Sequence, residues 1–197
     1  MPQRWAGALL VTAIGVAHAA NTANTANTVR PAQGGPDAAP RFTFYGLTPA
    51  LAGFDLRRAE AALGQPLALE PRPARRPAHS APASASAPGP ACQYRAVASQ
   101  PGVRYALSDG VITRIETRDS RWRSVSGVQV GSTVAQAELA YGKRLTVAPH
   151  PYFDQGHTLL VYSPDRRFAL VMEANDQGRI ITLRGGRLPE VAWLEGC

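Results

Sequence analysis

The sequence predicts an α+β protein: a tandem repeat of a short helix followed by a three-stranded antiparallel meander, with the two halves packed into one domain. Residues 50–64 (ALAGFDLRRAEAALG) and 127–142 (GVQVGSTVAQAELAYG) share a pattern of glycine, capping residue, Ala-Glu and glycine. Each copy precedes segments in which apolar and polar residues alternate, as is typical of strands. Neither half alone can bury its apolar face well, so we expect the halves to share a core.

Both expected helices begin at a residue that can cap their free amides. The side-chain oxygens of Asp55 and Thr133 can accept hydrogen bonds from the first helical turn. Gln136, three residues after Thr133, completes the pattern of a capping box. Apolar residues follow at helical spacing until Gly64 and Gly142, where glycine can adopt the left-handed conformation that ends a helix. Because such short helices are unstable alone in water, they must dock on a sheet.

Three strands are expected after each helix. They are residues 92–98, 103–108 and 111–117 in the first half and residues 157–163, 167–173 and 179–184 in the second half. Asp109-Gly110 lies between two of these segments and is a strong signal for a tight hairpin. The alternation indicates sheets with one covered face and one wet face. We expect Glu116 and Glu173 to be exposed acids on the wet face.

The chain divides into four regions. Residues 1–19 are predicted to be a signal peptide, residues 20–40 a disordered tether, residues 41–120 the first repeat with a proline-rich insertion at 71–90, and residues 121–197 the second repeat. The signal consists of Arg4, an apolar run and the small-residue triplet Ala17-His18-Ala19. The apolar run is shorter than the roughly 20 residues of a membrane helix. The sequence therefore predicts a periplasmic or secreted protein without a membrane span.

The only two cysteines, Cys92 and Cys197, both belong to the exported portion. An oxidising compartment favours one disulfide bond between them. Two unpaired thiols are the alternative. A bond would tie the end of the chain back to its middle.

The composition is strongly basic, with a net charge of +7. Every basic residue except Lys143 is an arginine, which suggests a coding bias more than a design for phosphate binding. Long-range attraction would still favour acidic partners. In the envelope these are acidic proteins or anionic polymers, and nucleic acid is a poor candidate.

Motifs for catalysis are scarce. The sequence contains no G-x-S-x-G, S-x-x-K or H-E-x-x-H motif and no glycine-rich phosphate loop. His150, Asp154 and His157 have a spacing that could seat a divalent metal, which defines a small metal-assisted hydrolase as an alternative. Prolines and a glycine around them favour an ordinary turn. We therefore expect no cofactor, no metal and no enzymatic activity.

Arginines and aromatic residues at two places are candidates for binding. The six candidates are Arg118, Arg121, Trp122, Arg123, Tyr152 and Phe153. The first four belong to the segment that joins the two halves, and tryptophan and arginine are enriched in binding hot spots. The other two occupy a loop and can project outward. The alternative for the joining segment is a solvated linker whose tryptophan packs against the sheet.

The repeated glycine, capping and Ala-Glu pattern, followed by strands, resembles the module of the beta-lactamase inhibitory proteins. It also resembles the SmpA/OmlA-like small lipoprotein of the outer-membrane barrel-assembly machinery. The resemblance covers residues 46–67, 92–117 and 127–187. The ending RLPEVAWLEGC (187–197), together with residues 127–142, is similar to uncharacterised secreted bacterial proteins. The chain departs from these families in having one expected disulfide in place of one in each unit, and no lipidated cysteine.

The resemblance implies paired units whose sheets form a concave surface for another protein. The predicted function is therefore an exported, non-enzymatic protein-binding module of the cell envelope, of the inhibitor or assembly-factor type. Its partner would be another envelope or secreted protein. The metal-assisted hydrolase and an electrostatic binder of anionic envelope polymers are the alternatives.

Overall fold

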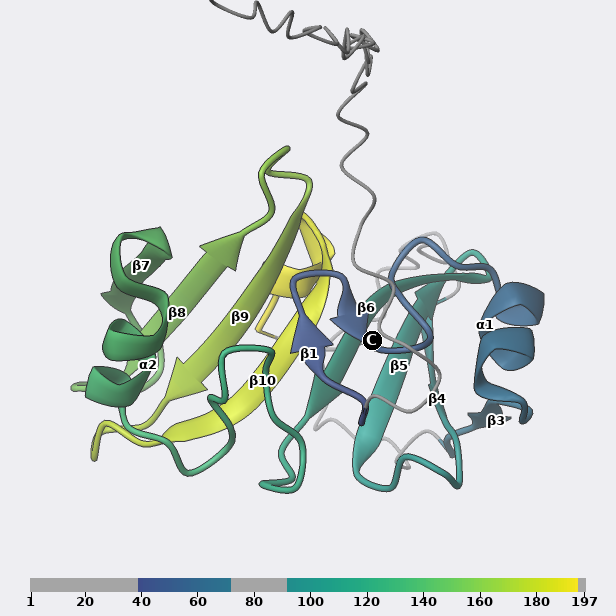
Figure 1. Cartoon of the computed structure of the whole chain (residues 1–197), viewed down its shortest axis with the longest axis horizontal. Helices are drawn as coiled ribbons and strands as arrows, with labels where there is room; N and C mark the ends of the chain where they lie inside the picture. The colour runs from purple at the N-terminus through teal and green to yellow at the C-terminus, as the bar shows by residue number, and fades with distance from the viewer. Residues whose placement is uncertain (1–38, 72–91, 195–197) are drawn as a thin grey trace, which may run out of the picture. The chain divides into compact units, whose positions relative to one another are not determined.

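The computed structural model describes residues 39–71 and 92–194, which are mostly β structure (Figure 1). An antiparallel eight-stranded sheet has the strand order β3-β4-β5-β6-β10-β9-β8-β7. Its strands are β3 (Ala68–Leu69), β4 (Cys92–Ala96), β5 (Val103–Ser108), β6 (Val111–Thr117), β7 (Leu145–Pro149), β8 (His157–Tyr162), β9 (Phe168–Ala174) and β10 (Ile180–Arg187). A separate two-stranded sheet pairs β1 (Phe42–Thr43) with β2 (Gly46–Leu47).

Several predicted features fall outside this part of the chain. The predicted signal peptide at 1–19 lies outside the described residues. So do almost all of the predicted tether at 20–40 and of the predicted insertion at 71–90. The last three residues, which include Cys197, also lie outside.

The predicted α+β fold, a repeat of a helix and a three-stranded meander, is wrong. The described residues hold one large sheet, a two-stranded sheet and only two short α-helices, α1 (Leu56–Leu63) and α2 (Val134–Tyr141). The short strands β3 and β7 lengthen the sheet at its edges, and β6 pairs with β10, which joins all eight strands. Local alternation shows which residues face the same side, but it does not show which distant strands pair.

The helix ends agree with the sequence. The Asp55 carboxylate accepts a backbone N–H of the first turn of α1 at 2.8 Å, and Gly64 ends that helix with φ +66°. In α2, Thr133 Oγ1 accepts from the Gln136 N–H at 3.1 Å, and Gln136 Oε1 accepts from the Thr133 N–H at 2.8 Å. This is the predicted capping box. A 3₁₀ turn, η1 (Gly142–Arg144), follows α2. Within the described residues, no helix combines the length and apolar character needed to cross a bilayer.

One face of the eight-stranded sheet is apolar and covered by α1, α2 and the β1–β2 hairpin (Figure 1). The largest buried side chains of this core are Phe42, Leu47, Leu67, Tyr105, Leu107, Ile112, Ile115, Leu159, Leu170, Met172, Ile180 and Leu183. At the centre, the hairpin backbone lies directly on Gly185 of β10. A Cβ at Gly185 would lie 2.3 Å from the Thr43 carbonyl oxygen and 2.6 Å from the Gly46 nitrogen. Only glycine allows this close approach of two backbones.

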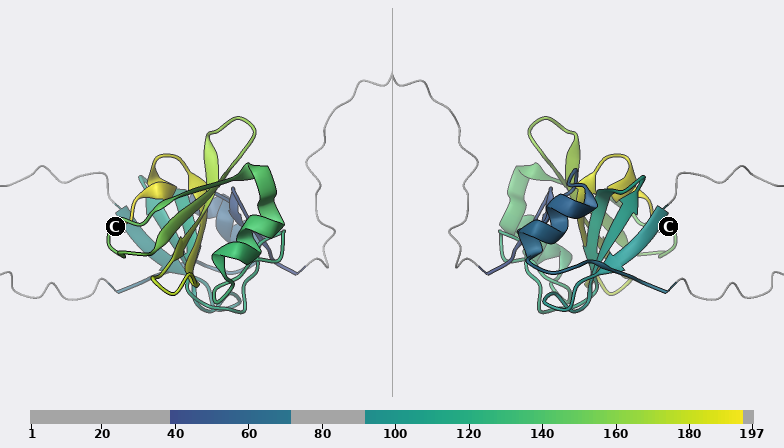
Figure 2. Two further views of the ribbon diagram at one scale, coloured as in Figure 1. Left: turned by 90° about the vertical axis from the view of Figure 1, so that its left-hand side faces the viewer. Right: turned by 90° about the vertical axis from the view of Figure 1, so that its right-hand side faces the viewer.

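The opposite face carries charged residues and is partly covered by the segment after β10. This segment contains a 3₁₀ turn, η2 (Glu190–Ala192), whose Val191 packs on Ala169 and Val171 of β9 in a second, smaller apolar cluster. Figure 2 shows α2 and η2 on opposite sides of the sheet. We call residues 188–194 the C-terminal segment. It brings the end of the described chain onto the charged face.

Candidate functional site

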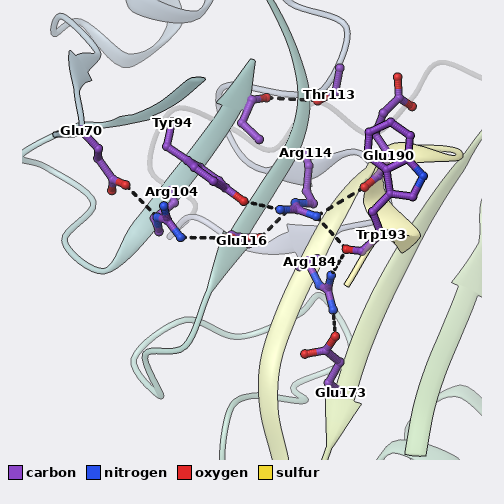
Figure 3. A network of polar contacts seen from close by, with 11 residues as sticks. Glu70, Tyr94, Arg104, Thr113, Arg114, Glu116, Glu173, Arg184, Glu190 and Trp193 are labelled. Carbon is purple, nitrogen blue, oxygen red and sulfur yellow. Dashed lines mark hydrogen bonds and ion pairs between the residues drawn. The ribbon is translucent and has the colours of Figure 1, made fainter. Parts of the chain in front are cut away.

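The candidate site is a series of ion pairs and hydrogen bonds on the charged face, which we call the arginine network (Figure 3). It consists of Glu70, Tyr94, Arg104, Arg114, Glu116, Glu173 and Arg184. Strand register brings these side chains together. Glu116 of β6 lies between Arg104 of β5 and Arg184 of β10, and all three point to the same face.

Arg104 forms the exposed end of the arginine network, with 43% of its side chain exposed. Its guanidinium stacks over the Tyr94 ring at 3.6 Å from the ring centre. Its Nε donates to Glu70 Oε2 at 2.7 Å, and its Nη1 donates to Glu116 Oε1 at 3.3 Å. Burial alone would lower the pKa of Arg104, but the hydrogen bond and charge of Glu70 raise it above the usual value. Stacking and ion pairing together hold this exposed cation in one orientation.

Arg114 connects the sheet to the C-terminal segment. Only 4% of its side chain is exposed, and its Nε lies 3.0 Å from Glu116 Oε2. Its Nη2 donates to the Tyr94 hydroxyl, and its Nη1 donates to the Trp193 carbonyl oxygen at 2.8 Å. Burial and the charge of Glu116 raise the pKa of Tyr94 and outweigh the opposing effect of Arg114. One buried guanidinium therefore joins β4, β6 and the end of the described chain.

Arg184 and Glu173 form the most buried ion pair of the arginine network. The exposed fractions of their side chains are 3% and 9%. Arg184 also donates from Nη1 to the Trp193 carbonyl oxygen at 2.5 Å, so two arginines share this acceptor. Burial, and next the positive charge of Arg114, lower the pKa of Arg184 to about 10. This value still leaves the guanidinium protonated at neutral pH.

His150 lies beside this pair. Its Nε2 is 3.8 Å from Glu173 Oε1, and its Nδ1 accepts a hydrogen bond from the Tyr152 N–H at 3.1 Å. Burial, and next the charge of Arg184, lower the pKa of His150. The charge of Asp176 acts in the opposite direction. The uncharged imidazole is therefore the favoured form in this position.

The expectation that Glu116 and Glu173 are exposed acids is wrong. Each carboxylate pairs with an arginine on the same face, and Glu173 is buried. Arg114 and Arg184 were not among the predicted candidate residues. The spacing of Arg114 and Glu116, two residues apart on one strand, was the available signal for a pair on one face.

The predicted binding residues of the joining segment lie beyond the end of β6. Arg118 is exposed, and Arg121 binds Asp119 with Nη2 2.5 Å from Oδ2, an ion pair that lowers the pKa of Asp119 to about 2. Trp122 is half-buried against the main core, and its indole donates to a backbone carbonyl of the β4–β5 loop at 3.0 Å. Arg123 is exposed and lines a cleft beside α2.

The other two predicted binding residues lie in the β7–β8 loop. The Tyr152 residue is 69% exposed, whereas Phe153 is half-buried with its ring 4.7 Å from the His150 ring. In the sheet, β10 and β9 separate β8 from β6. The six candidates therefore form two separate groups, one next to β6 and the other next to β8, with β10 and β9 between them. Whether either group binds a partner stays a prediction.

The residues of the alternative metal site are not brought together. His150 is buried beside Glu173, whereas Asp154 is exposed in the loop and His157 begins β8. Across residues 39–71 and 92–194, no group of three or more histidine, cysteine, aspartate or glutamate side chains is placed to hold a metal ion. The predicted set of three ligands is therefore not a preformed site.

Cys92 begins β4, and its register opposite Ser108 places it on the same face as Tyr94. Its predicted disulfide partner, Cys197, lies outside the described residues. The bond therefore stays a prediction.

Comparison with protein-family models, curated proteins and solved structures gives no match for this chain. The resemblance to the beta-lactamase inhibitory proteins and to the assembly lipoprotein therefore stays a prediction.

Proposed function

We propose that this protein is a non-enzymatic binding module of the cell envelope that recognises another envelope or secreted protein through the charged face of its sheet. The observation that carries the proposal is that Trp193 is exposed while its backbone is held in place. This residue is 55% exposed, while its carbonyl oxygen accepts hydrogen bonds from the buried Arg114 and Arg184. An exposed tryptophan with a fixed backbone is a typical anchor of a protein interface.

The stacked pair of Arg104 and Tyr94 provides a second anchor on the same face (Figure 3). Arg104 contacts two carboxylates and an aromatic ring before any partner arrives. An interface residue that is already ordered loses little conformational entropy on binding. Arginine and tyrosine, like tryptophan, are enriched among the residues that contribute most to binding.

The charge of the chain favours an acidic partner. The net charge is +7, and the exposed Arg118 lies close enough to Arg184 to affect its pKa. Such charge accelerates association with a negatively charged surface. Anchor residues that become buried in the complex mainly control the dissociation rate. An acidic protein segment that covers Trp193 and Arg104 fits both features. A partner of this kind agrees with the inhibitor or assembly-factor role that the resemblance implies.

A binding experiment with one anchor removed tests the proposal. The oxidised mature chain is immobilised, proteins of an envelope extract that it retains are identified, and each purified candidate is titrated against variants. Trp193→Ala should weaken binding of the true partner about 30-fold, because truncation of an interface anchor typically costs about 2 kcal/mol or more. Arg104→Ala should weaken it in the same direction, without loss of folding by circular dichroism.

The control is Leu139→Ala. Leu139 is 89% exposed on α2, on the helix-covered side of the sheet, so this variant also removes an exposed apolar side chain. It should bind the partner like the unchanged chain. Equal affinity of all variants would refute the proposed face. Binding that falls with salt but does not depend on Trp193 would indicate electrostatic adhesion to anionic polymers in its place.

A further inference from the structure

A cleft of about 460 Å³ lies between α2 and the loop that precedes it. The loop, residues 123–132, contributes one wall, and Gln136 and Ala140 of α2 contribute the other. Arg179, next to β10, lies at its edge and donates from Nη1 to the Gly131 carbonyl oxygen at 3.1 Å. The volume is within the range of small-ligand sites, roughly 300–1,000 Å³.

The charged residues that line this cleft are all positive. Arg123 and Arg179 are its charged lining residues, and both are exposed. No aspartate or glutamate is among the described residues that line it. Two arginines among the lining residues, without a lining acid to neutralise them, favour an anionic ligand with paired oxygen atoms.

The cleft is preformed by hydrogen bonds within the loop. The hydroxyl of Tyr141 donates to Ser124 Oγ at 2.7 Å, and Ser124 Oγ also accepts the Val128 N–H at 3.1 Å. Ser132 Oγ accepts the Gln129 N–H at 3.1 Å. These bonds fix the loop from inside before a ligand arrives. A preformed site binds with a smaller loss of conformational entropy.

We infer that this cleft binds the carboxylate end of a peptide chain. The two arginines match a terminal carboxylate, and the half-buried Val130 and Ala140 match a small aliphatic side chain. The amide of Gln136 and the hydroxyl of Ser132 supply polar partners for peptide groups next to that carboxylate. Backbone groups that capture a terminal carboxylate and arginine clusters that recognise acidic motifs are both known modes of peptide recognition. This site is separate from the proposed interface around Trp193.

Titration with a matched pair of peptides tests the inference. The probe is acetyl-Ala-Ala with a free carboxylate, and its control is the same peptide with a terminal amide. Binding is followed by the amide NMR signals of the full chain, with shifts expected at Gly127, Gln129 and Gly131. The acid should bind at least about tenfold more tightly than the amide, because charge-assisted bonds to arginine are lost in the amide. The same Ala-Ala end on an inert carrier protein shows whether termini of whole proteins or only short peptides are accepted.

Substitutions test whether the peptide binds in the cleft. Arg123→Ala and Arg179→Ala should each weaken binding of the acid about tenfold, whereas Arg167→Ala, an exposed arginine that does not line the cleft, should not. Trp193→Ala should leave peptide binding unchanged, so failure here and failure of the proposed interface are separable. Equal binding of acid and amide, or no shift in the loop at any peptide concentration, would overturn the inference.

Discussion

The two faces of the eight-stranded sheet consist of the same strands but are covered in different ways. On the apolar face, α1, α2 and the β1–β2 hairpin bury a continuous cluster of hydrocarbon. On the charged face, the C-terminal segment is attached through polar contacts: the Trp193 carbonyl accepts from Arg114 and Arg184, and Glu190 pairs with Arg187. A small apolar cluster around Val191 also supports it.

This difference shows two ways to cover a sheet. Apolar burial is non-directional and stabilises in proportion to the area removed from water. A buried charged network stabilises only if every member has its partner, because an uncompensated buried charge is costly. The apolar face should therefore tolerate changes that keep volume, whereas the charged face should respond most strongly to the loss of one charge.

The largest expected effect is on the charged face. Arg184→Met leaves Glu173 buried without its partner and should lower the free energy of unfolding by about 3–5 kcal/mol. Urea unfolding followed by circular dichroism measures the loss. The double variant Arg184→Met/Glu173→Leu should recover much of the loss. A double variant that is no more stable than Arg184→Met would contradict this account of the pair.

The next largest effect should be on the apolar face, where two backbones meet. Gly185→Ala places a methyl group 2.3 Å from the Thr43 carbonyl oxygen, so the β1–β2 hairpin must move. We expect a loss of about 3 kcal/mol in the free energy of unfolding. Gly64→Ala makes the same chemical change where a Cβ meets nothing within 4 Å, and it should cost only about 1 kcal/mol for its left-handed conformation. Equal losses in the two variants would rule out the close approach at Gly185.

The smallest effect is the pH dependence of the charged face. The pKa of His150 is lowered from its ordinary value of 6.5 by burial and by Arg184, with Asp176 acting in the opposite direction. The unfolded chain therefore takes up the proton first as the pH falls. Stability from this group is complete above about pH 6.5 and is lost progressively as the pH falls toward the lower folded value. Melting temperatures measured from pH 8 to pH 5 should fall less steeply for His150→Asn than for the unchanged chain, and parallel curves would contradict the assignment.

Sequence reasoning succeeded where the determinant is local. Asp55, Thr133 and Gln136 predicted the helix starts, because a cap acts within one turn. Asp109-Gly110 predicted the β5–β6 hairpin, in which both residues have positive φ. Each of the six expected strand segments also overlaps a strand of the large sheet.

The failures concern contacts between distant parts of the chain. The pairing of β6 with β10 depends on residues far apart in sequence, so alternation in either strand cannot reveal it. Strand β7 was missed because it ends at Pro149, a residue that argues against an interior strand but suits an edge strand. Buried Arg114 and Arg184 were missed because an arginine at a wet-face position gives no sign that a later segment will cover it.

The central position of β10 has a consequence for the order in which the sheet can form. Strand β10 is the last strand of the described chain, yet it lies between β6 and β9 in the middle of the sheet. While a nascent chain ends at residue 179, its strands can form two separate meanders, each with an unpaired inner edge. Proteases and other chains have access to these edges until synthesis reaches the end of β10 and this strand closes the gap.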